Sequence, residues 1–490
     1  MKHRHRNAAR RRLRVVGLLL SLGLVATACS GDDADRDAAA TPTFGDEEPT
    51  AAPDGPAGTE GPGGADISDG SDQPDGPASE EEPSPIFEPE GERTVPEEVP
   101  PEEVRVVRVG YAFPDLAAFA VLNEDFGIGD PQLQAEAVVD GWRRQGLLPP
   151  GIEVDLVFAS YNIISTTDKI AACTELAEDA DVDIAVSGLT FWVGAECLAE
   201  RFGIPVIATE GEDRATYQRG APWLFTLRPD DITYYSAFAD WAIDQGILAD
   251  RRVGLFFETP LTDGVDAMRG RLEAAGVQIV SVTETSGEGI GGPEDRTVVQ
   301  RFLDDEVDVV LPLVGGSSAV NMYNFAESQG YRPVYLDVDY AEHTTDVAAK
   351  TNPANQYDGT LAMTVTRIGE QAGGVENAGA EACLANYERY AAQDISRQPP
   401  ESGEYSSILR TCDLFTVLLA ALTGAADDPS GANFVAALEQ AGRIELVGSA
   451  GGSFSAEDHS LIDEYRTIQW DAACPCWRAQ DDFAAMAPAN

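Results

Sequence analysis

The sequence predicts an α/β protein of two lobes, each built on a parallel β-sheet that is flanked by helices. From about residue 104, short β-branched runs alternate with amphipathic stretches, which is the pattern of repeated βαβ units. Two series of such units follow one another, and residues 226–231, of sequence TLRPDD, interrupt the pattern between them. Residues 104–490 are also too many for one such sheet, so we expect two lobes.

The expected elements follow in chain order. In the first series, strands are expected at 105–113, 153–160, 183–189 and 205–210. Helices are expected at 166–178 and 192–202, and Thr166, Thr167 or Asp168 can cap the first of them. In the second series, strands at 252–258, 278–284, 308–314 and 333–338 alternate with helices at 263–275, 295–305 and 319–329. Beyond Gly359 come an extended segment, helices at 378–392, 405–424 and 433–441, and a final strand within 451–470. We therefore place lobe one at about 104–228 and 359–450, and lobe two at about 232–358 and 451–490.

Residues 1–29 have the features of a lipoprotein export signal. The first fourteen residues carry seven basic side chains and no acid, and the apolar run at 15–26 is too short to span ~30 Å of hydrocarbon. The run ends in Ala26-Thr27-Ala28-Cys29, which resembles the bacterial lipobox. We expect an extracytoplasmic protein that is anchored to the cell membrane by lipid on Cys29, with no later membrane-spanning helix. The alternative is an ordinary signal peptide in which Cys29 falls by chance.

Residues 30–103 are expected to form a disordered acidic linker. Residues 30–102 hold 22 acids against Arg36 and Arg93, and they are rich in proline and glycine with few aromatics. Such a stretch cannot bury enough apolar surface to offset its chain entropy. The acidity of this stretch and of the whole chain, with a formal net charge of −51, argues against nucleic acid as a partner.

Cysteine usage predicts disulfides rather than a metal site. Seven cysteines are present, and lipidation of Cys29 would leave six, an even number in an oxidising compartment. The only histidines beyond the export signal are His343 and His459, and neither has zinc-ligand spacing to a pair of cysteines. Cys474 and Cys476 form C-x-C, not the C-x-x-C of thioredoxin-like redox sites.

Between residues 104 and 475 the chain resembles the type I periplasmic binding proteins, specifically the leucine/isoleucine/valine-binding branch. The opening strand 105–110 leads to Pro114, and 173–176 followed by 183–188 is similar to the family's helix, strand and ligand-facing loop. Residues 203–207 and 228–231 match the next strand and the first crossover between lobes. Residues 308–318, followed by a helix ending at 328–330, are similar to a unit of the second lobe. Order and spacing carry the resemblance, since each motif is short.

The resemblance implies a function as well as a fold. Members of the family close two lobes around a small polar solute, such as an amino acid or a related compound, and deliver it to the permease subunits of an ABC transporter. They use no cofactor. A ligand sensor that passes its closed state to a signalling partner is the main alternative, because it uses the same fold.

The resemblance also points to ligand-binding residues in lobe one. The loop after the third strand, 187–192, corresponds to the family's carboxylate-binding loop, which makes Ser187 and Thr190 candidates; their alternative role is helix capping. The next loop departs from amino-acid binders because it carries Glu210 and Glu212. These acids favour a cationic or polyhydroxylated solute, unless they simply face water. Trp192 and Phe126 are expected as apolar walls, although aromatics at such places are more often core.

From lobe two, four residues are expected to reach the solute. Asp337 or Asp339 corresponds to the family's ammonium-binding acid, with a solvated loop acid as the alternative. Ser317 and Ser318 lie where the neighbouring strand presents side chains to the ligand, although a turn or helix cap explains them equally well.

Two disulfides are expected from the order of the helices. Cys173 and Cys197 lie on consecutive helices that flank neighbouring strands, and Cys383 and Cys412 lie on successive helices of lobe one. Cys474–Cys476 would close a small strained ring, so cross-pairing stays open.

An enzyme is not expected. Residues 287–292 spell G-x-G-x-x-G, but Pro293 interrupts the approach to the helix and Asp308 begins the next strand instead of ending it. The sequence contains no G-x-S-x-G, Walker A or H-E-x-x-H motif.

Overall fold

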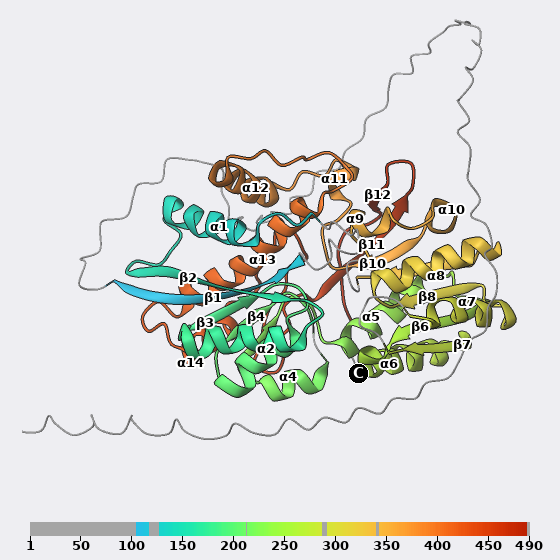
Figure 1. The fold of residues 1–490 in the computed structure, drawn as a ribbon, viewed down its shortest axis with the longest axis horizontal. Coiled ribbons are helices and arrows are strands. Elements are labelled where there is room, and N and C mark those ends of the chain that lie inside the picture. Colours follow the sequence, from blue (N-terminus) through green and yellow to red (C-terminus); the bar gives the residue numbers. More distant parts are fainter. Residues whose placement is uncertain (1–103, 117–126, 212, 287–291, 340–342, 488–490) are drawn as a thin grey trace, which may run out of the picture. The chain divides into compact units, whose positions relative to one another are not determined.

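The computed structural model describes residues 104–116, 127–211, 213–286, 292–339 and 343–487 (Figure 1). All of them belong to one compact unit, Glu80–Asn490. The export signal with Cys29, the linker, Phe126, Glu212 and most of the glycine-rich segment 287–292 lie outside the described residues, and the expectations about them stay predictions.

Lobe one is built on a five-stranded parallel sheet of order β2-β1-β3-β4-β5. Its strands are β1 Arg105–Asp115, β2 Ile152–Asn162, β3 Ile184–Ser187, β4 Val206–Ala208 and β5 Leu224–Thr226. Its helices are α1 Pro131–Gln145, α2 Thr166–Thr174, α3 Trp192–Glu196, α4 Arg214–Gly220, α12 Ala378–Ala391, α13 Gly403–Gly424 and α14 Gly431–Glu439. Strands β3, β4 and β5 are buried at every position, as expected for a parallel sheet that is covered on both faces.

Lobe two is built on an eight-stranded sheet of order β12-β11-β10-β9-β8-β6-β7, with β13 paired to β11. Its strands are β6 Arg252–Glu258, β7 Gln278–Thr285, β8 Val309–Leu313, β9 Val334–Val338, β10 Leu361–Thr364, β11 Glu464–Asp471, β12 Cys476–Ala479 and β13 Ala484–Ala485. Its helices are α5 Asp231–Asp244, α6 Thr262–Ala274, α7 Glu294–Asp304, α8 Gly316–Gln329, α9 Asp346–Ala349 and α10 Ala354–Tyr357. The short helix α11 Glu370–Gly373 packs on β12.

The structure confirms the α/β class and the parallel core of both lobes, and it changes two details. The lobe-two sheet is mixed, because β11 runs antiparallel to β10, β12 and β13. The boundaries at 359 and 451 are wrong: β10 pairs with β9 of lobe two, whereas Ser460 forms a bridge with Thr226 of lobe one. Such pairings join residues far apart in the chain, so local pattern cannot reveal them.

Three segments cross between the lobes and lie side by side. The first follows β5, and its Leu227 carbonyl accepts the backbone N–H of Ile462 from the third crossing, at 2.9 Å. The second follows β10, where the Val365 carbonyl accepts the N–H of Ala450 at 2.8 Å. The first crossing therefore falls at the predicted interruption, residues 226–231.

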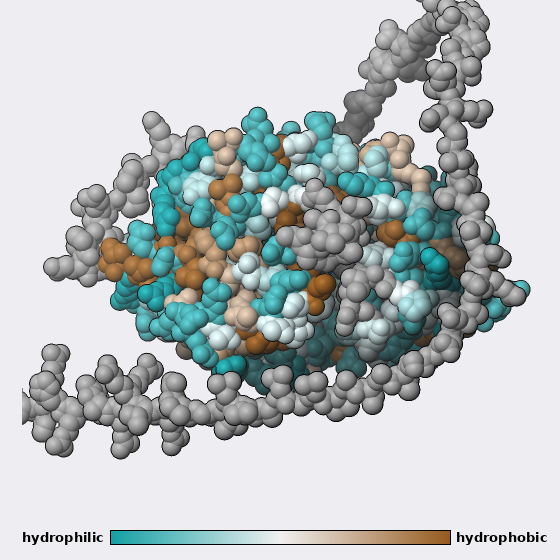
Figure 2. Space-filling view, in the orientation of Figure 1, coloured by the Kyte–Doolittle hydropathy of each residue, from teal (hydrophilic) through white to brown (hydrophobic). Residues whose placement is uncertain are grey.

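Helix α13 is the central helix of lobe one. Within the described residues it is the one helix long and apolar enough to cross a membrane, yet 72% of that apolar window is buried inside the fold. It packs against β3 and β4, and Phe415 stacks edge-on to Tyr111 of β1. Its length and apolarity therefore fit a core helix. Figure 2 shows a mostly hydrophilic described surface on the face in view, with smaller apolar areas between.

Three disulfides cross-link the described part of the chain. Cys173 is joined to Cys197 and Cys383 to Cys412, the two pairs that the helix order predicts. Cys474 is joined to Cys476 at the turn between β11 and β12. Both long-range pairs tie helices of lobe one.

Candidate functional site

The carboxyl ends of β3 and β4 bring several of the predicted ligand residues together. Ser187, the last residue of β3, lies in register with Ala208, the last residue of β4, so the loops that follow these strands are neighbours. The Glu210 carboxylate accepts hydrogen bonds from the Thr190 backbone N–H at 2.7 Å and from the Trp192 indole N–H at 2.6 Å. These three residues therefore form one cluster.

Thr190 has an unusual backbone conformation. Its φ of 61° lies in the left-handed region, which a β-branched residue rarely adopts. Residues held in such conformations tend to gather at binding and catalytic sites, where the surrounding structure enforces them. The surrounding structure therefore holds the turn between β3 and α3 in a backbone conformation that is typical of binding sites.

Three hydroxyls at these loops are buried and have no hydrogen-bond partner within the described residues. They belong to Ser187, Thr190 and Thr209. Ser187 is fully buried and Thr209 is 4% exposed. Buried polar groups are almost always paired, so unpaired ones indicate a place for a bound polar molecule. Thr209 was missed by sequence reasoning, although its position directly after a predicted strand was a usable signal.

Neighbouring side chains hold this turn in place. Phe191 packs on Tyr161, with ring centroids 4.7 Å apart, and the Tyr161 hydroxyl donates to the Leu189 carbonyl. Burial, with a smaller contribution from the charge of Glu210, raises the pKa of Tyr161 well above its usual range, so it stays a donor. The Lys169 ammonium lies 5.4 Å from the Trp192 ring centroid, a cation–π geometry.

Lobe two presents its predicted acids differently. The Asp337 carboxylate is fully buried and accepts hydrogen bonds from the Tyr357 hydroxyl at 2.6 Å and the Val338 N–H at 2.9 Å. His343 Nδ1 lies 3.2 Å from it. Burial alone would lower the pKa of His343, but the charge and hydrogen bond of Asp337 raise it. Asp337 is therefore held inside lobe two by protein groups.

Asp339 is also engaged by its own surroundings. One carboxylate oxygen accepts from the Thr344 hydroxyl, and the other accepts from the Thr364 hydroxyl at 2.7 Å and the Val365 N–H at 2.8 Å. Its backbone carbonyl accepts from Arg228 at 3.0 Å, a contact between the lobes. The contacts of Asp339 therefore tie β9 to β10 and to the first crossing.

The two predicted serines of lobe two begin helix α8. Ser318 is 4% exposed and Ser317 is half-buried. The preceding Gly315 N–H donates to Glu258 at 2.7 Å. Their position after β8 agrees with the expected strand–loop–helix, and their role toward a ligand stays a prediction.

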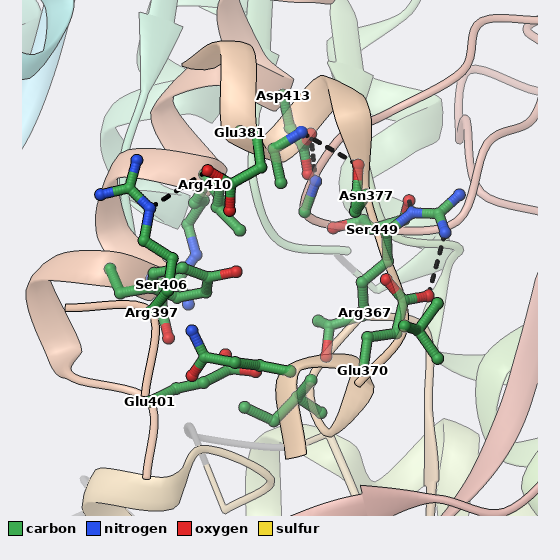
Figure 3. A pocket seen from close by; sticks show the side chains of 18 of the residues that line it. Arg367, Glu370, Asn377, Glu381, Arg397, Glu401, Ser406, Arg410, Asp413 and Ser449 are labelled. Carbon is green, nitrogen blue, oxygen red and sulfur yellow. Dashed lines mark hydrogen bonds and ion pairs between the residues drawn. The ribbon is translucent and has the colours of Figure 1, made fainter. Parts of the chain in front are cut away.

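A cavity lies between the crossing segments, the lobe-one helices and the lobe-two loop at 344–345. Its volume is about 490 Å³. The crossings contribute Arg228, Thr366 and Ser449 to its lining. Helices α12 and α13 and their ends contribute Asn377, Glu381, Ser406, Arg410 and Asp413 (Figure 3). None of the predicted ligand residues that the structure describes lines this space. Its lining residues lie as far apart in the chain as Arg228 and Ser449, so no local sequence pattern marks this cavity.

A smaller space of about 20 Å³ adjoins this cavity. Leu189, Thr209 and Glu210 line it from lobe one. Arg228, Thr366, Arg410 and Ser449 line both spaces. Glu210 of the predicted lobe-one cluster therefore lies beside the cavity, across this small space.

Charged side chains line the cavity. Arg367 pairs with Glu370 at 3.0 Å and Arg397 with Glu381 at 3.2 Å. Two further acids are buried: burial, and then the charge of Asp346, raises the pKa of Glu401 well above its usual range. Burial raises the pKa of Asp413 to about 6. The cavity thus offers polar groups of both signs, which could orient a small polar molecule.

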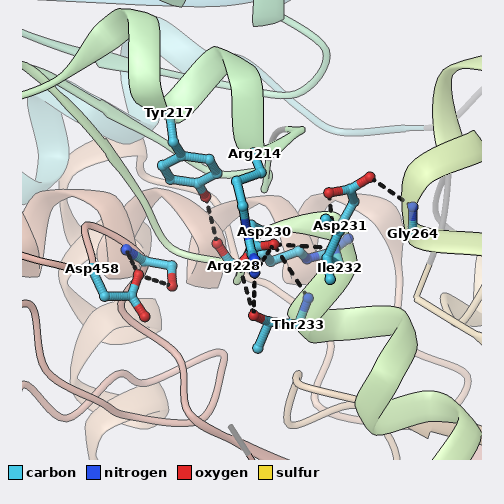
Figure 4. Close-up of polar contacts among 10 residues, drawn as sticks. Arg214, Tyr217, Arg228, Asp230, Asp231, Ile232, Thr233, Gly264 and Asp458 are labelled. Carbon is cyan, nitrogen blue, oxygen red and sulfur yellow. Dashed lines mark hydrogen bonds and ion pairs between the residues drawn. The ribbon is translucent and has the colours of Figure 1, made fainter. Parts of the chain in front are cut away.

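The first crossing is fixed by an aspartate pair (Figure 4). Asp230 caps α5 by accepting the N–H groups of Ile232 at 3.1 Å and Thr233 at 3.3 Å. Asp231 accepts the N–H of Gly264 at 3.1 Å, which joins the start of α5 to α6. Within the described residues, no group of three or more histidine, cysteine or acidic side chains could hold a metal ion.

A family model described as "Periplasmic binding protein" matches residues 150–475. No curated protein matches the chain by sequence.

Several solved structures share the fold of this chain at low sequence identity. A possible leucine/isoleucine/valine-binding protein from Rhodopirellula baltica SH 1 matches with a TM-score of 0.60 and 14% identity, covering 78% of this chain and 98% of its own. A branched-chain amino acid ABC transporter protein from Thermus thermophilus with bound valine matches with a TM-score of 0.61 and 13% identity, covering 78% and 97%. A solute-binding protein from Rhodopseudomonas palustris HaA2, in complex with p-hydroxybenzoic acid, matches with a TM-score of 0.59 and 13% identity, covering 79% and 98%.

Proposed function

This chain belongs to the periplasmic binding protein family, and on that premise we propose that it is an extracytoplasmic lipoprotein that captures a small polar solute between its lobes for ABC-type uptake. The observation that carries the proposal is the polar cavity of about 490 Å³ beside the three crossings, lined by both lobes. Closing the lobes around a solute would shift an open–closed equilibrium that membrane partners can sense.

The solute is proposed to be small and polar. Solved relatives hold valine and p-hydroxybenzoic acid, so amino acids and hydroxylated aromatics are the first classes to test. The cavity's mix of arginines, acids and serines suits a molecule that both donates and accepts hydrogen bonds.

The anchor and the partners complete the proposal. Lipid on Cys29 would hold the protein at the membrane, and the acidic linker would let the folded part reach the permease subunits of the transporter. Cys29→Ala is expected to release the protein from the membrane fraction into the medium. A variant that stays membrane-bound would contradict lipid anchoring through this residue.

No turnover of the solute is proposed, since the family is one of binding proteins. Recovery of the bound solute unchanged after prolonged incubation is the expected result. A chemically altered solute would overturn this part of the proposal.

The main experiment is a thermal-shift screen of the exported protein against amino acids, amides, polyamines, sugars and hydroxybenzoates. A ligand at a hundredfold excess over its Kd should add about 2.7 kcal/mol to the free energy of unfolding. Arg410→Ala, at the junction of the two spaces, should weaken binding of any hit about tenfold. Arg332→Ala, which breaks a pair with Glu327 in lobe two outside both spaces, is the matched control.

If no solute class shifts the melting temperature, the proposed function fails. If a hit binds but cells lacking the protein take it up as before, the uptake role fails and a sensing role replaces it.

A further inference from the structure

We propose that Glu210 acts as a built-in substitute for a solute carboxylate, so that the site favours solutes that present an uncharged amide or hydroxyl to lobe one. This inference deepens the proposed function and rests on it. It assigns to Glu210 the role of a specificity-determining residue.

The geometry shows a carboxylate site that is already filled. One oxygen of Glu210, Oε2, accepts both the Thr190 N–H at 2.7 Å and the Trp192 indole N–H at 2.6 Å. Hydrogen bonds of this kind, from N–H donors to an ionised acceptor, are short and strong. Two donors that could bind an incoming carboxylate are therefore engaged by the protein itself.

The surroundings keep both donors aimed at this position. The left-handed φ of Thr190 sets the direction of its N–H. The Tyr161–Phe191 contact and the hydrogen bond from Tyr161 to Leu189 fix the turn, and Lys169 lies over the Trp192 ring. These contacts support the turn from several sides, so both donors stay directed at Glu210.

Three buried hydroxyls in the loops after β3 and β4 suit an uncharged partner, and the Thr209 side chain among them lines the small space. The hydroxyls of Ser187, Thr190 and Thr209 are buried and have no partner within the described residues, and each can donate or accept. A solute carboxylate would meet the like charge of Glu210, whereas an amide or hydroxyl would not. Arg228 and Arg410 line the same small space, and capture of a carboxylate by these arginines is the rival that the experiment must separate.

The first experiment tests whether Glu210 fills an anion site, without any natural solute. In the full exported protein, Glu210→Ala should vacate the two donors, and added acetate or formate should then raise the melting temperature in a saturable manner. The indole N–H signal of Trp192 in nitrogen-15 NMR, assigned with Trp192→Phe, should move on titration. Wild type and Glu200→Ala, which removes an exposed acid from the same lobe, should not respond. An acetate response of Glu210→Ala no larger than that of Glu200→Ala overturns the proposal.

The second experiment tests selection with matched probes: valine against valinamide, and 4-hydroxybenzoate against 4-hydroxybenzamide. Wild type should bind the amide of the pair about tenfold more tightly than the acid, and Glu210→Ala should lose that preference. Glu210→Gln, which keeps the shape and removes the charge, should also lose it and serves if the alanine variant does not fold.

The outcomes separate the two proposals. Solute binding with the same acid-to-amide ratio in wild type and variants overturns the role of Glu210 alone. Acetate rescue without binding of any solute in the wider screen overturns the proposed function and with it the selection, leaving Glu210 as a fixed element of the turn.

Discussion

Asp413 shows how a single residue in the cavity wall couples burial to pH. Its side chain is fully buried on α13, and its Oδ1 accepts the N–H groups of Val447 at 2.7 Å and Gly448 at 2.9 Å. Burial nevertheless dominates and raises the pKa of Asp413 to about 6 from an ordinary value of 3.8. The folded protein therefore holds this proton to a higher pH than the unfolded chain does.

A pH-dependent difference between wild type and Asp413→Asn is expected. Between about pH 4 and pH 6 the folded form binds more protons than the unfolded chain, so the stability of wild type falls as the pH rises through this window. The asparagine side chain keeps the accepting oxygen and does not titrate. The free energy of unfolding of Asp413→Asn, relative to that of wild type, should therefore rise by roughly 3 kcal/mol as the pH increases through this window. Denaturant unfolding at several pH values measures this. Asp394→Asn, at an exposed acid, is the control, and a difference independent of pH would contradict the prediction.

The contacts of Asp339 predict a large contribution to stability. Because its carboxylate satisfies the Thr364 hydroxyl and the Val365 N–H in a buried position, Asp339→Ala should lower the free energy of unfolding by about 3 kcal/mol. The same substitution at Asp304, an exposed residue of α7, should cost little. A variant as stable as wild type would show that these hydrogen bonds do not hold the β9–β10 connection.

At the scale of elements, the start of α5 links the first crossing to lobe two. Asp230 was predicted as part of an interruption in the pattern and of the first crossover, and the structure shows it as the N-cap of this helix. It accepts from Ile232 and Thr233 and pairs with Arg214 at 3.0 Å (Figure 4). The interruption in the sequence is thus the point where a helix begins and the chain changes lobes.

Asp230→Ala should destabilise the protein by about 1 to 2 kcal/mol, the usual cost of removing an N-cap. Amide hydrogen exchange should rise first in the opening turn of α5, at Ile232 and Thr233. Asp230→Asn retains a capping oxygen but loses the ion pair with Arg214 and one acceptor for the Thr233 hydroxyl, so it should lose less stability than the alanine variant. Equal loosening in both variants would show that the ion pair, not the cap, fixes this end.

The elements also show where local pattern loses its power. Strands β1, β6 and β8 are predicted well, because each is a short run rich in β-branched, aromatic or leucine side chains. Helices α1 and α5 were not among the predicted helices, and β10 was predicted in lobe one although it belongs to the sheet of lobe two. The run at 361–364 would bury its side chains in either sheet, and its pairing with β9 decides between them.

At the scale of the whole molecule, the long-range disulfides are unevenly distributed. Lobe one is cross-linked by Cys173–Cys197 and Cys383–Cys412, whose sequence separations are 24 and 29 residues. Within the described part of lobe two, the cross-link is Cys474–Cys476, whose sequence separation is only 2. The unfolded state of lobe one is therefore constrained more than that of lobe two.

Removing either long-range disulfide by paired serine substitution should cost roughly 3 kcal/mol. Hydrogen exchange should increase in α2, α3, α12 and α13 before it increases in lobe two. The pair Cys474→Ser and Cys476→Ser is the matched control and should change stability little. Uniform loosening of both lobes would show that they unfold as one unit regardless of the cross-links.

The sequence alone determined the two-lobed α/β class, the position of the first crossing and the two long-range disulfides, because each depends on local periodicity or on the order of helices. It also singled out Thr190, Trp192 and Glu210, which the structure brings into one cluster, and Ser187, which ends β3 in register with Ala208 of β4. Only the tertiary structure decided what those residues do: it turned Glu210 toward the donors of its neighbours and enclosed Asp337 and Asp339 among hydroxyls and backbone N–H groups. The cavity itself belongs wholly to the tertiary level. Its walls come from crossings and helices that meet only when both sheets have formed, and no stretch of sequence contains them.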